Sequence, residues 1–178
     1  MLRPQLRHLG LFVWDMGVME RFYSDVLGMT ATDRGRVPRL DNREILFLSS
    51  CPDDHHQLVL LGGREGKGPS MVNQISFEVK GLAELREMYS RVEAAGIAPI
   101  KQVSHGNSWS LYSADPEGNG LEIYADTPWH VNQPQTHPLD LTMVDAEILA
   151  ATESSIKDDS TFSPQHEWVE RMAIALGR

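Results

Sequence analysis

The amino-acid sequence predicts an α+β fold made of two βαβββ modules, followed by a helical C-terminal tail. The chain has 178 residues, enough for one ordinary domain or two small halves that share a core. The same order of predicted elements, a strand, a helix and about three more strands, occurs twice along the chain. We expect the modules to cover residues 1–62 and 70–129 and to form a cupped mixed and antiparallel sheet. Residues 130–178 are then a C-terminal extension with two helices.

Composition limits the class of protein. Hydrophobic residues make up 41% of the chain and charged residues 23%, as in folded globular proteins. The formal net charge of -9 disfavours nucleic acid and anionic membranes as partners. A single cysteine, Cys51, excludes an intrachain disulfide and a thiolate zinc site. Because no apolar run is long enough to cross a bilayer and residues 1–5 lack the pattern of a secretory signal, we expect a cytoplasmic protein.

The two modules are related by an offset of 66 residues, at which Val13 aligns with Val79. Each module opens with a short apolar stretch rich in β-formers, over residues 8–13 and 74–79, which predicts a strand. A helical pattern of apolar residues follows each strand. Asp15 is a suitable N-cap for the first helix, and Gly28 and Gly96 stand where the two helices are expected to end.

Further strands are expected after each helix, at residues 44–49 and 56–61 and at residues 108–113 and 120–124. Each pair flanks a proline-containing turn, and the two prolines, Pro52 and Pro116, lie 64 residues apart. At that offset Leu58 aligns with Glu122. The glycine-rich run from Gly62 to Pro69 is expected to link the modules.

The tail is expected to hold two helices. Thr142 and Asp145 resemble a capping box that opens a helix reaching about Ile156. Ser163 and Pro164 offer an N-cap and a first-turn proline for the last helix. We interpret the tail as packing against the sheets or against a second subunit.

Three polar side chains fall on strand positions that the repeat brings together: His8, Gln74 and Glu122. Glu122 lies between Leu121 and Ile123 and faces away from both, since neighbouring strand residues alternate. A carboxylate in an apolar strand needs a partner, although an exposed position on a two-faced strand explains it equally well. His8 alone also fits an ordinary surface histidine. If paired modules bring first and last strands together, the three converge as a plausible site for a divalent transition metal.

Other candidate site residues lie nearby in the predicted strands. His56 is expected to point into the same cavity near its mouth, whereas His55 is expected to point away into solvent. His105 stands in a loop ahead of the strand that carries Tyr112. Tyr112 is also explained as a simple core aromatic residue.

These residues resemble a known superfamily. His8, the stretch from Asn73 to Phe77, and the turn and strand from Asp115 to Glu122 resemble the vicinal oxygen chelate superfamily of glyoxalases, bleomycin-resistance proteins and dioxygenases. The chain looks most like the catalytic half of type I extradiol dioxygenases, from about Leu6 to Trp129. The Asp-Pro-x-Gly-Asn-x-x-Glu turn is shared across the superfamily, so it indicates the fold better than the reaction.

The resemblance implies a divalent metal, Fe(II) first and Mn, Zn or Ni as alternatives, held by His8, Gln74 and Glu122. In the dioxygenases the middle ligand is a histidine, so Gln74 is a departure that bears on iron affinity and redox poise. Glutamine is a metal ligand in glyoxalase I of the same superfamily. The resemblance also implies that His56, His105 and Tyr112 are the catalytic side chains, as cavity histidine, acid–base histidine and substrate-contacting tyrosine.

The implied function is cleavage of a catecholic aromatic ring with O2, in aromatic catabolism. Two other functions stay open: a non-oxidative isomerase, epimerase or lyase that uses a redox-inert metal, and a non-catalytic protein that binds an antibiotic-type small molecule. We expect a small aromatic substrate, no nucleic-acid or membrane partner, and a homo-oligomer. The modules can pair within one chain or between chains.

Overall fold

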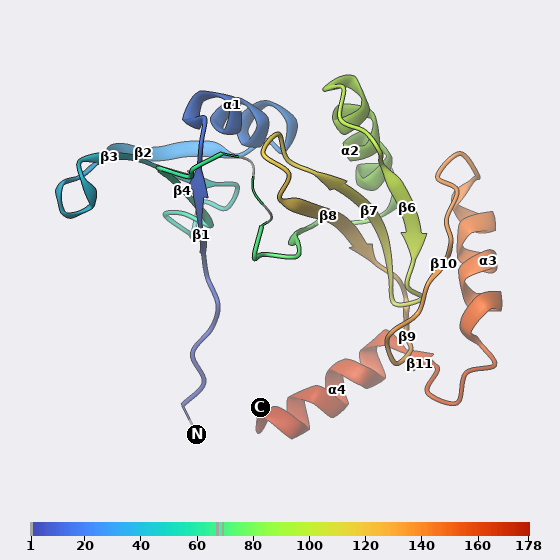
Figure 1. Ribbon diagram of the computed structural model, residues 1–178. Helices are drawn as coiled ribbons and strands as arrows, with labels where there is room; N and C mark the ends of the chain where they lie inside the picture. The colour runs from blue at the N-terminus through green and yellow to red at the C-terminus, as the bar shows by residue number, and fades with distance from the viewer. Residues whose placement is uncertain (1, 67, 69) are drawn as a thin grey trace. The chain divides into compact units, whose positions relative to one another are not determined.

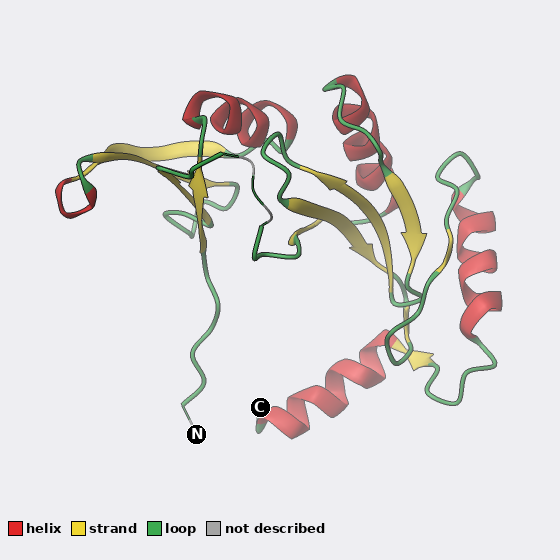
Figure 2. Ribbon diagram, viewed as in Figure 1, coloured by secondary structure: helices red, strands yellow, loops and turns green. Residues whose placement is uncertain are grey.

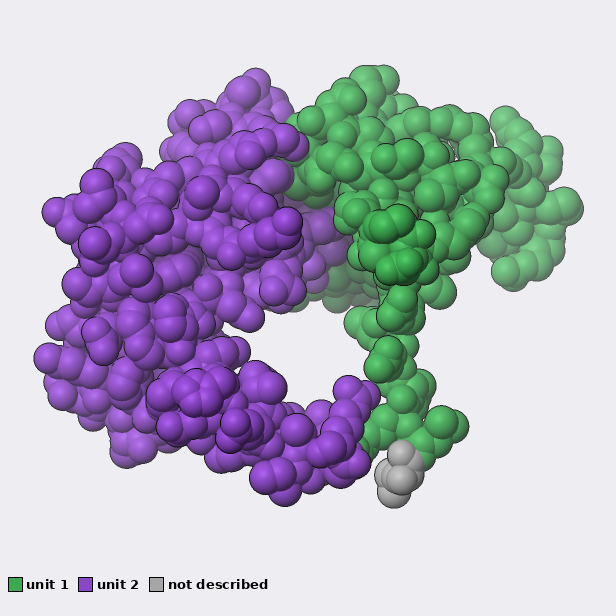
Figure 3. All heavy atoms as spheres, turned by 180° about the vertical axis from the view of Figure 1, so that it is seen from behind, with its two compact units in different colours: residues 1–73, 114–119 green, residues 74–113, 120–178 purple. Residues whose placement is uncertain are grey.

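The computed structural model describes residues 2–66, 68 and 70–178 (Figures 1 and 2). Part of the expected linker, Lys67 and Pro69, lies outside the described residues. The chain forms two compact units (Figure 3). Unit 1 is Met1–Asn73 with Ala114–Asn119, and unit 2 is Gln74–Ser113 with Gly120–Arg178. The tail predicted as a separate extension is therefore grouped with the second module in unit 2.

Unit 1 contains a four-stranded sheet in the order β1-β4-β3-β2. Strands β1 and β4 run parallel, and the other neighbours are antiparallel. Helix α1 is followed directly by a π-helical turn, η1, and a short 3-10 turn, η2, precedes β3. The bounds are β1 (Leu9–Val13), α1 (Met16–Arg21), η1 (Phe22–Val26), β2 (Thr30–Val37), η2 (Pro38–Leu40), β3 (Arg43–Ser49) and β4 (Leu58–Gly62).

Local sequence accounts for the start and end of this helical segment. The Asp15 carboxylate accepts a hydrogen bond from the backbone N–H of Val18 at 3.0 Å, so the predicted N-cap is confirmed. At the other end Gly28 has φ 73°, a left-handed conformation that favours glycine.

The two faces of the unit 1 sheet differ. Alternate leucine and valine side chains on one face are buried together with the helical residues Met19, Phe22 and Tyr23. Full burial of one such side chain contributes about 1.5–3 kcal/mol. The opposite face keeps apolar side chains only partly covered, and Phe12 on it is 56% exposed. The buried sheet residues are Leu11, Val13, Leu46, Leu48, Leu58 and Leu60.

Unit 2 repeats the same topology. Its sheet has the order β10-β6-β7-β8-β5, in which β5 and β8 are parallel as β1 and β4 are. The predicted pair of βαβββ modules is therefore confirmed, with a short tail strand added at the β6 edge. The bounds are β5 (Ile75–Glu78), α2 (Leu82–Ala94), β6 (Lys101–Ser104), β7 (Ser108–Ala114), β8 (Gly120–Asp126) and β10 (His137–Pro138).

The strand register corrects one predicted equivalence. In unit 1 Gly10 pairs with Val59, and in unit 2 the corresponding Ser76 pairs with Glu122. Val59, not Leu58, is thus the counterpart of Glu122. The offset taken from the two prolines is wrong by one residue, because the connections leading into β4 and β8 differ in length. A shift of one residue moves a side chain to the other face of a strand, and Leu58 indeed faces the core, 2% exposed.

The tail contains the two predicted helices, α3 (Asp145–Ile156) and α4 (Gln165–Leu176), but neither begins as expected. Val144 is the N-cap of α3, and the Thr142 hydroxyl donates instead to the Asp140 carboxylate at 2.6 Å. Ser163 does not cap α4, since it belongs to strand β11 (Ser163–Pro164), which pairs with β9 (Trp129–His130). The predicted capping box and serine cap are therefore wrong.

Helix α3 belongs to the core of unit 2. The indole N–H of Trp109 on β7 donates to the Thr152 hydroxyl at 2.8 Å, and both side chains are buried. Ile148 and Ile156 of α3 are each 2% exposed. The interpretation that the tail packs against a sheet holds for this helix. Within the described part of the chain, no helix has the length and apolarity needed to cross a bilayer.

Candidate functional site

Glu122 is the centre of a polar cluster on one face of the unit 2 sheet. Its Oε2 accepts hydrogen bonds from the Gln74 amide at 2.7 Å and the Ser76 hydroxyl at 2.6 Å. Its Oε1 accepts from the Ser110 hydroxyl at 2.8 Å and the Tyr112 hydroxyl at 2.6 Å. Since a carboxylate offers about four acceptor positions, these donors saturate it. Glu122 is 9% exposed. The sequence predicted that a buried carboxylate here needs a partner, and the structure provides four.

The donors keep Glu122 ionised. Burial raises the pKa of this carboxyl group, but hydrogen bonds from Ser76, Tyr112 and Ser110 and the charge of His105 outweigh it, so the pKa lies below its usual value. Burial and the bond to Glu122 raise the pKa of Tyr112 to about 12. The pair is therefore a carboxylate and a protonated phenol at neutral pH.

His105 continues this chain of hydrogen bonds. Its Nδ1 lies 2.6 Å from the carbonyl oxygen of Gln135, which only accepts, so Nδ1 carries a hydrogen. The one hydroxyl hydrogen of Tyr112 is directed at Glu122, so the Tyr112 oxygen accepts from Nε2 of His105 at 2.8 Å. His105, Tyr112 and Glu122 therefore form one continuous series of hydrogen bonds.

Two other predicted site residues meet in unit 1. The His8 ring, exposed just before β1, lies 4.5 Å from the His56 ring between centroids. His56 also packs edge-on against Phe47 at 5.1 Å. Burial and the neighbouring imidazoles of His8 and His55 lower the pKa of His56. His55 is exposed as predicted, and its Nδ1 lies 2.9 Å from Nδ1 of His56.

The six predicted site residues thus form two clusters. Unit 1 brings together His8 and His56, and unit 2 brings together Gln74, His105, Tyr112 and Glu122. Sequence reasoning missed Ser110 as a partner of Glu122 and gave Ser76 no role. Strand alternation carried the signal, since Ser110 and Tyr112 are two residues apart and so share a face.

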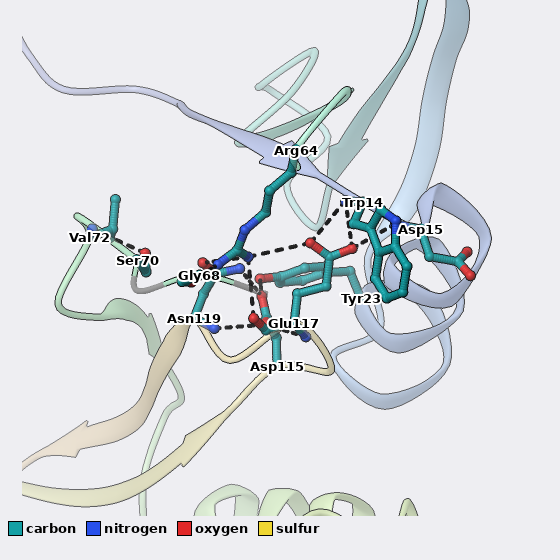
Figure 4. Close-up of polar contacts among 10 residues, drawn as sticks. All are labelled: Trp14, Asp15, Tyr23, Arg64, Gly68, Ser70, Val72, Asp115, Glu117 and Asn119. Atoms are coloured by element: carbon teal, nitrogen blue, oxygen red, sulfur yellow. Dashed lines mark hydrogen bonds and ion pairs between the residues drawn. The ribbon is translucent and has the colours of Figure 1, made fainter. Parts of the chain in front are cut away.

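The Asp-Pro-x-Gly-Asn turn has a structural role in unit 1 (Figure 4). Glu117 accepts hydrogen bonds from the backbone N–H groups of Trp14 and Asp15 at 2.8 and 2.7 Å, at the start of α1. Asp115 accepts from the buried Tyr23 hydroxyl at 3.0 Å and from the Asn119 amide at 2.7 Å. These contacts explain the acidic residues of the turn without catalysis.

The donor set in unit 2 fits a divalent metal after one rearrangement. Carboxylate and amide oxygens bind such ions, and the Gln74 and Glu122 side chains are already adjacent. The Gln74 amide must turn its oxygen to the ion, and Glu122 must release at least one donor. Among the described residues, no three His, Cys, Asp or Glu side chains gather closely enough to hold a metal. Gln74 is outside those residue types and His8 belongs to unit 1, so the trio remains a prediction.

Sequence comparison identifies relatives of known activity. The chain is 30% identical over 129 residues to biphenyl-2,3-diol 1,2-dioxygenase 3 of Rhodococcus globerulus, covering 69% of this chain and 64% of the relative. It is 29% identical over 151 residues to catechol-2,3-dioxygenase of Bacillus subtilis, covering 80% of this chain and 50% of the relative. The matches span less than two thirds of the length of these curated relatives.

Solved structures share the fold. A glyoxylase/bleomycin resistance protein/dioxygenase domain from Frankia sp. EAN1pec has a TM-score of 0.60 at 21% identity, covering 71% of this chain and 94% of that chain. The fosfomycin resistance protein FosX of Listeria monocytogenes, solved with Mn(II) and sulfate, has a TM-score of 0.56 at 18% identity, covering 71% of this chain and 95% of that chain.

The glyoxalase/bleomycin resistance protein/dioxygenase superfamily matches residues 5–123, which include both modules as far as β8. The repeated βαβββ topology and the structural neighbours agree with that match. The chain therefore belongs to this superfamily, also called the vicinal oxygen chelate superfamily.

Proposed function

We propose that this protein is an extradiol-type dioxygenase that cleaves a catecholic aromatic ring with O2, with a divalent metal, Fe(II) first, held by His8, Gln74 and Glu122. The observation that carries the proposal is the series His105–Tyr112–Glu122, which joins a proton donor to a proposed metal ligand. The catechol and biphenyl-diol dioxygenases among the relatives support the reaction class. In such a site Fe(II) supplies a Lewis acid for both catechol oxygens and the redox chemistry of O2.

Within unit 2, His105 supplies a proton and Tyr112 supplies a hydrogen bond. The Gln135 carbonyl fixes the orientation of the His105 ring and keeps a hydrogen on Nδ1. The hydrogen on Nε2 is held against the Tyr112 oxygen, so it is available to a reacting oxygen that replaces this contact. Because the pKa of Tyr112 is raised to about 12, the phenol stays protonated and acts as a hydrogen-bond donor.

In unit 1 the partly covered sheet face suits an aromatic ring. Phe12 and Leu61 are neighbours on β1 and β4, and Val59 and Phe47 are neighbours on β4 and β3. Aromatic and branched side chains on a flat sheet face bind a planar ring by apolar contact and ring stacking. His56 at the edge of this face provides a nitrogen for a substrate hydroxyl.

Anaerobic loading with Fe(II), addition of a panel of catechols and biphenyl-diols, and then admission of O2 tests the proposal. Ring cleavage gives a yellow product and consumes O2 with the diol. A matched Tyr112→Phe protein is expected to form the same product more slowly. A colourless solution and no O2 uptake across the panel, with iron bound, would refute the proposal.

Gln74 favours one second candidate, a non-oxidative isomerase, epimerase or lyase. An amide oxygen is a harder and weaker ligand than imidazole, which suits a redox-inert ion better than Fe(II). Metal analysis of the purified protein separates the two candidates, because nickel, zinc or cobalt without iron supports the second. Activity in the ring-cleavage assay supports the first.

A further inference from the structure

A chain of three polar side chains ends at His56 in unit 1. The carboxylate of Asp33 on β2 lies 2.8 Å from Nε2 of His55. The Nδ1 of His55 lies 2.9 Å from Nδ1 of His56. Phe47 packs edge-on against both imidazoles, with ring centroids 5.9 Å from His55 and 5.1 Å from His56. These contacts could not be predicted from the sequence, because Asp33 lies on β2, a strand that was not predicted.

The hydrogens in this chain have a fixed order when both histidines are neutral. A carboxylate only accepts, so Nε2 of His55 donates to Asp33. The other nitrogen of a neutral imidazole has no hydrogen, so Nδ1 of His55 accepts. Nδ1 of His56 must then be the donor, and Nε2 of His56 has a free lone pair. Asp33 therefore sets which nitrogen of His55 carries a hydrogen, and His55 in turn sets which nitrogen of His56 does.

We propose that Asp33 and His55 are positioning residues that hold His56 in its Nδ1–H form, so that its bare Nε2 accepts a hydrogen bond from a substrate hydroxyl. The use of that nitrogen rests on the proposed function, whereas the tautomer does not.

The expected effect is a bias in the tautomer ratio. The Asp33 and His55 side chains are 66% and 57% exposed, so water competes for their hydrogen bonds. Exposed pairs of this kind shift an equilibrium by about two- to fivefold. Phe47 limits the freedom of both rings, which favours the mutual contact over two separate contacts to water.

Nitrogen-15 NMR of the metal-free, substrate-free full chain tests the proposal, because protonated and bare ring nitrogens have well separated shifts. Spectra at about pH 8.5 report neutral histidines, well above their ordinary pKa. The variants are Asp33→Ala and His55→Phe, which keeps an aromatic ring beside Phe47. Asp53→Ala is the matched control, since it removes one exposed carboxylate from the turn that precedes His55. Circular dichroism checks that each variant is folded.

The expected result is a His56 ring mainly in the Nδ1–H form, with the ratio of Nδ1–H to Nε2–H falling about two- to fivefold in Asp33→Ala and His55→Phe. Asp53→Ala leaves the ratio unchanged. A wild-type His56 in the Nε2–H form, or a ratio that is the same in all four proteins, overturns the proposal.

Kinetics then separate this proposal from the proposed function. With a diol that the wild type cleaves, both variants are expected to lose kcat by a factor like that of the tautomer ratio, with KM little changed. A rise in KM without a fall in kcat, or an equal fall in kcat in Asp53→Ala, overturns the positioning role. If no diol is cleaved but the tautomer ratio shifts as expected, the proposed function is wrong, whereas the positioning of His56 by Asp33 and His55 is confirmed.

Discussion

Replacing Tyr112 with phenylalanine removes one hydroxyl that joins two groups of the candidate site. The lost bonds are the donation to Glu122 at 2.6 Å and the acceptance from His105 at 2.8 Å. A hydrogen bond to a charged group contributes about 1.5–3 kcal/mol, and water can replace part of it because Tyr112 is only half-buried. We therefore expect Tyr112→Phe to lower the free energy of unfolding by about 1–2 kcal/mol.

The same substitution has two further consequences. The pKa of Glu122 rises towards its usual value, because one of the bonds that lower it is gone. Under the proposed function kcat falls about 100-fold, the scale of one lost acid–base partner. Urea unfolding, carboxyl carbon NMR and the ring-cleavage assay measure the three effects.

Tyr124→Phe is the matched control for Tyr112→Phe, since it removes a hydroxyl from a half-buried tyrosine on β8. We expect it to leave kcat and the pKa of Glu122 close to those of the wild type. The reasoning is refuted if both variants lose the same stability and activity, or if Tyr112→Phe leaves the pKa of Glu122 unchanged.

Three other substitutions test separate parts of the account. Because folding lowers the pKa of Glu122, the carboxylate stabilises the fold above its unfolded pKa of about 4.3, and this contribution is lost as the pH falls through the lower folded pKa. The difference in unfolding free energy between wild type and Glu122→Gln should therefore shrink in urea melts at acid pH. A difference that stays constant with pH, as expected for the exposed control Glu78→Gln, would contradict this. Gln74→His should raise Mn(II) or Fe(II) affinity about tenfold in anaerobic titrations, since imidazole is the stronger ligand; unchanged or weaker binding would argue against a ligand role at this position. Glu117→Gln should lower the free energy of unfolding by about 2–3 kcal/mol, because it removes a 2% exposed carboxylate that accepts hydrogen bonds from backbone N–H groups. A loss no larger than that of the exposed control Glu65→Gln would disprove the structural role of the turn.

The repeated module could be predicted because its signal is periodic and apolar. The strands that were found, β1, β4 and β8 among them, bury alternate apolar side chains, and the helices bury residues at helical spacing. Strand β2 was missed because its eight residues, from Thr30 to Val37, are charged or small and almost wholly exposed. Strand β6 is short and mostly polar, so it too lacks a strong pattern.

Register and caps depended on information that is not local. The equivalence of Leu58 with Glu122 rested on two prolines, but the hydrogen bonds of the sheets set the register at Val59. Thr142 has the sequence of a cap, yet its hydroxyl donates to the Asp140 carboxylate in the turn before α3 and does not cap the helix. Both errors come from contacts that a local pattern does not describe.

The candidate site was predictable where strand alternation and the repeated module place side chains. Gln74 and Tyr112 were expected near Glu122, and the hydrogen bonds confirm that proximity. The contact of His105 with the Gln135 carbonyl was not predictable, because it joins a loop to the tail across 30 residues. The grouping of His8 with the Glu122 cluster was predicted from the repeat and the resemblance, and it stays a prediction.

Metal stoichiometry after anaerobic reconstitution with Fe(II) tests the central claim most directly. Elemental analysis of desalted wild type, His8→Ala and Glu122→Gln gives the iron bound per chain. The account predicts about one iron per wild-type chain and a large loss in both variants, since each removes a ligand from a three-ligand site. Wild-type protein without bound iron, or full iron in both variants, would contradict it.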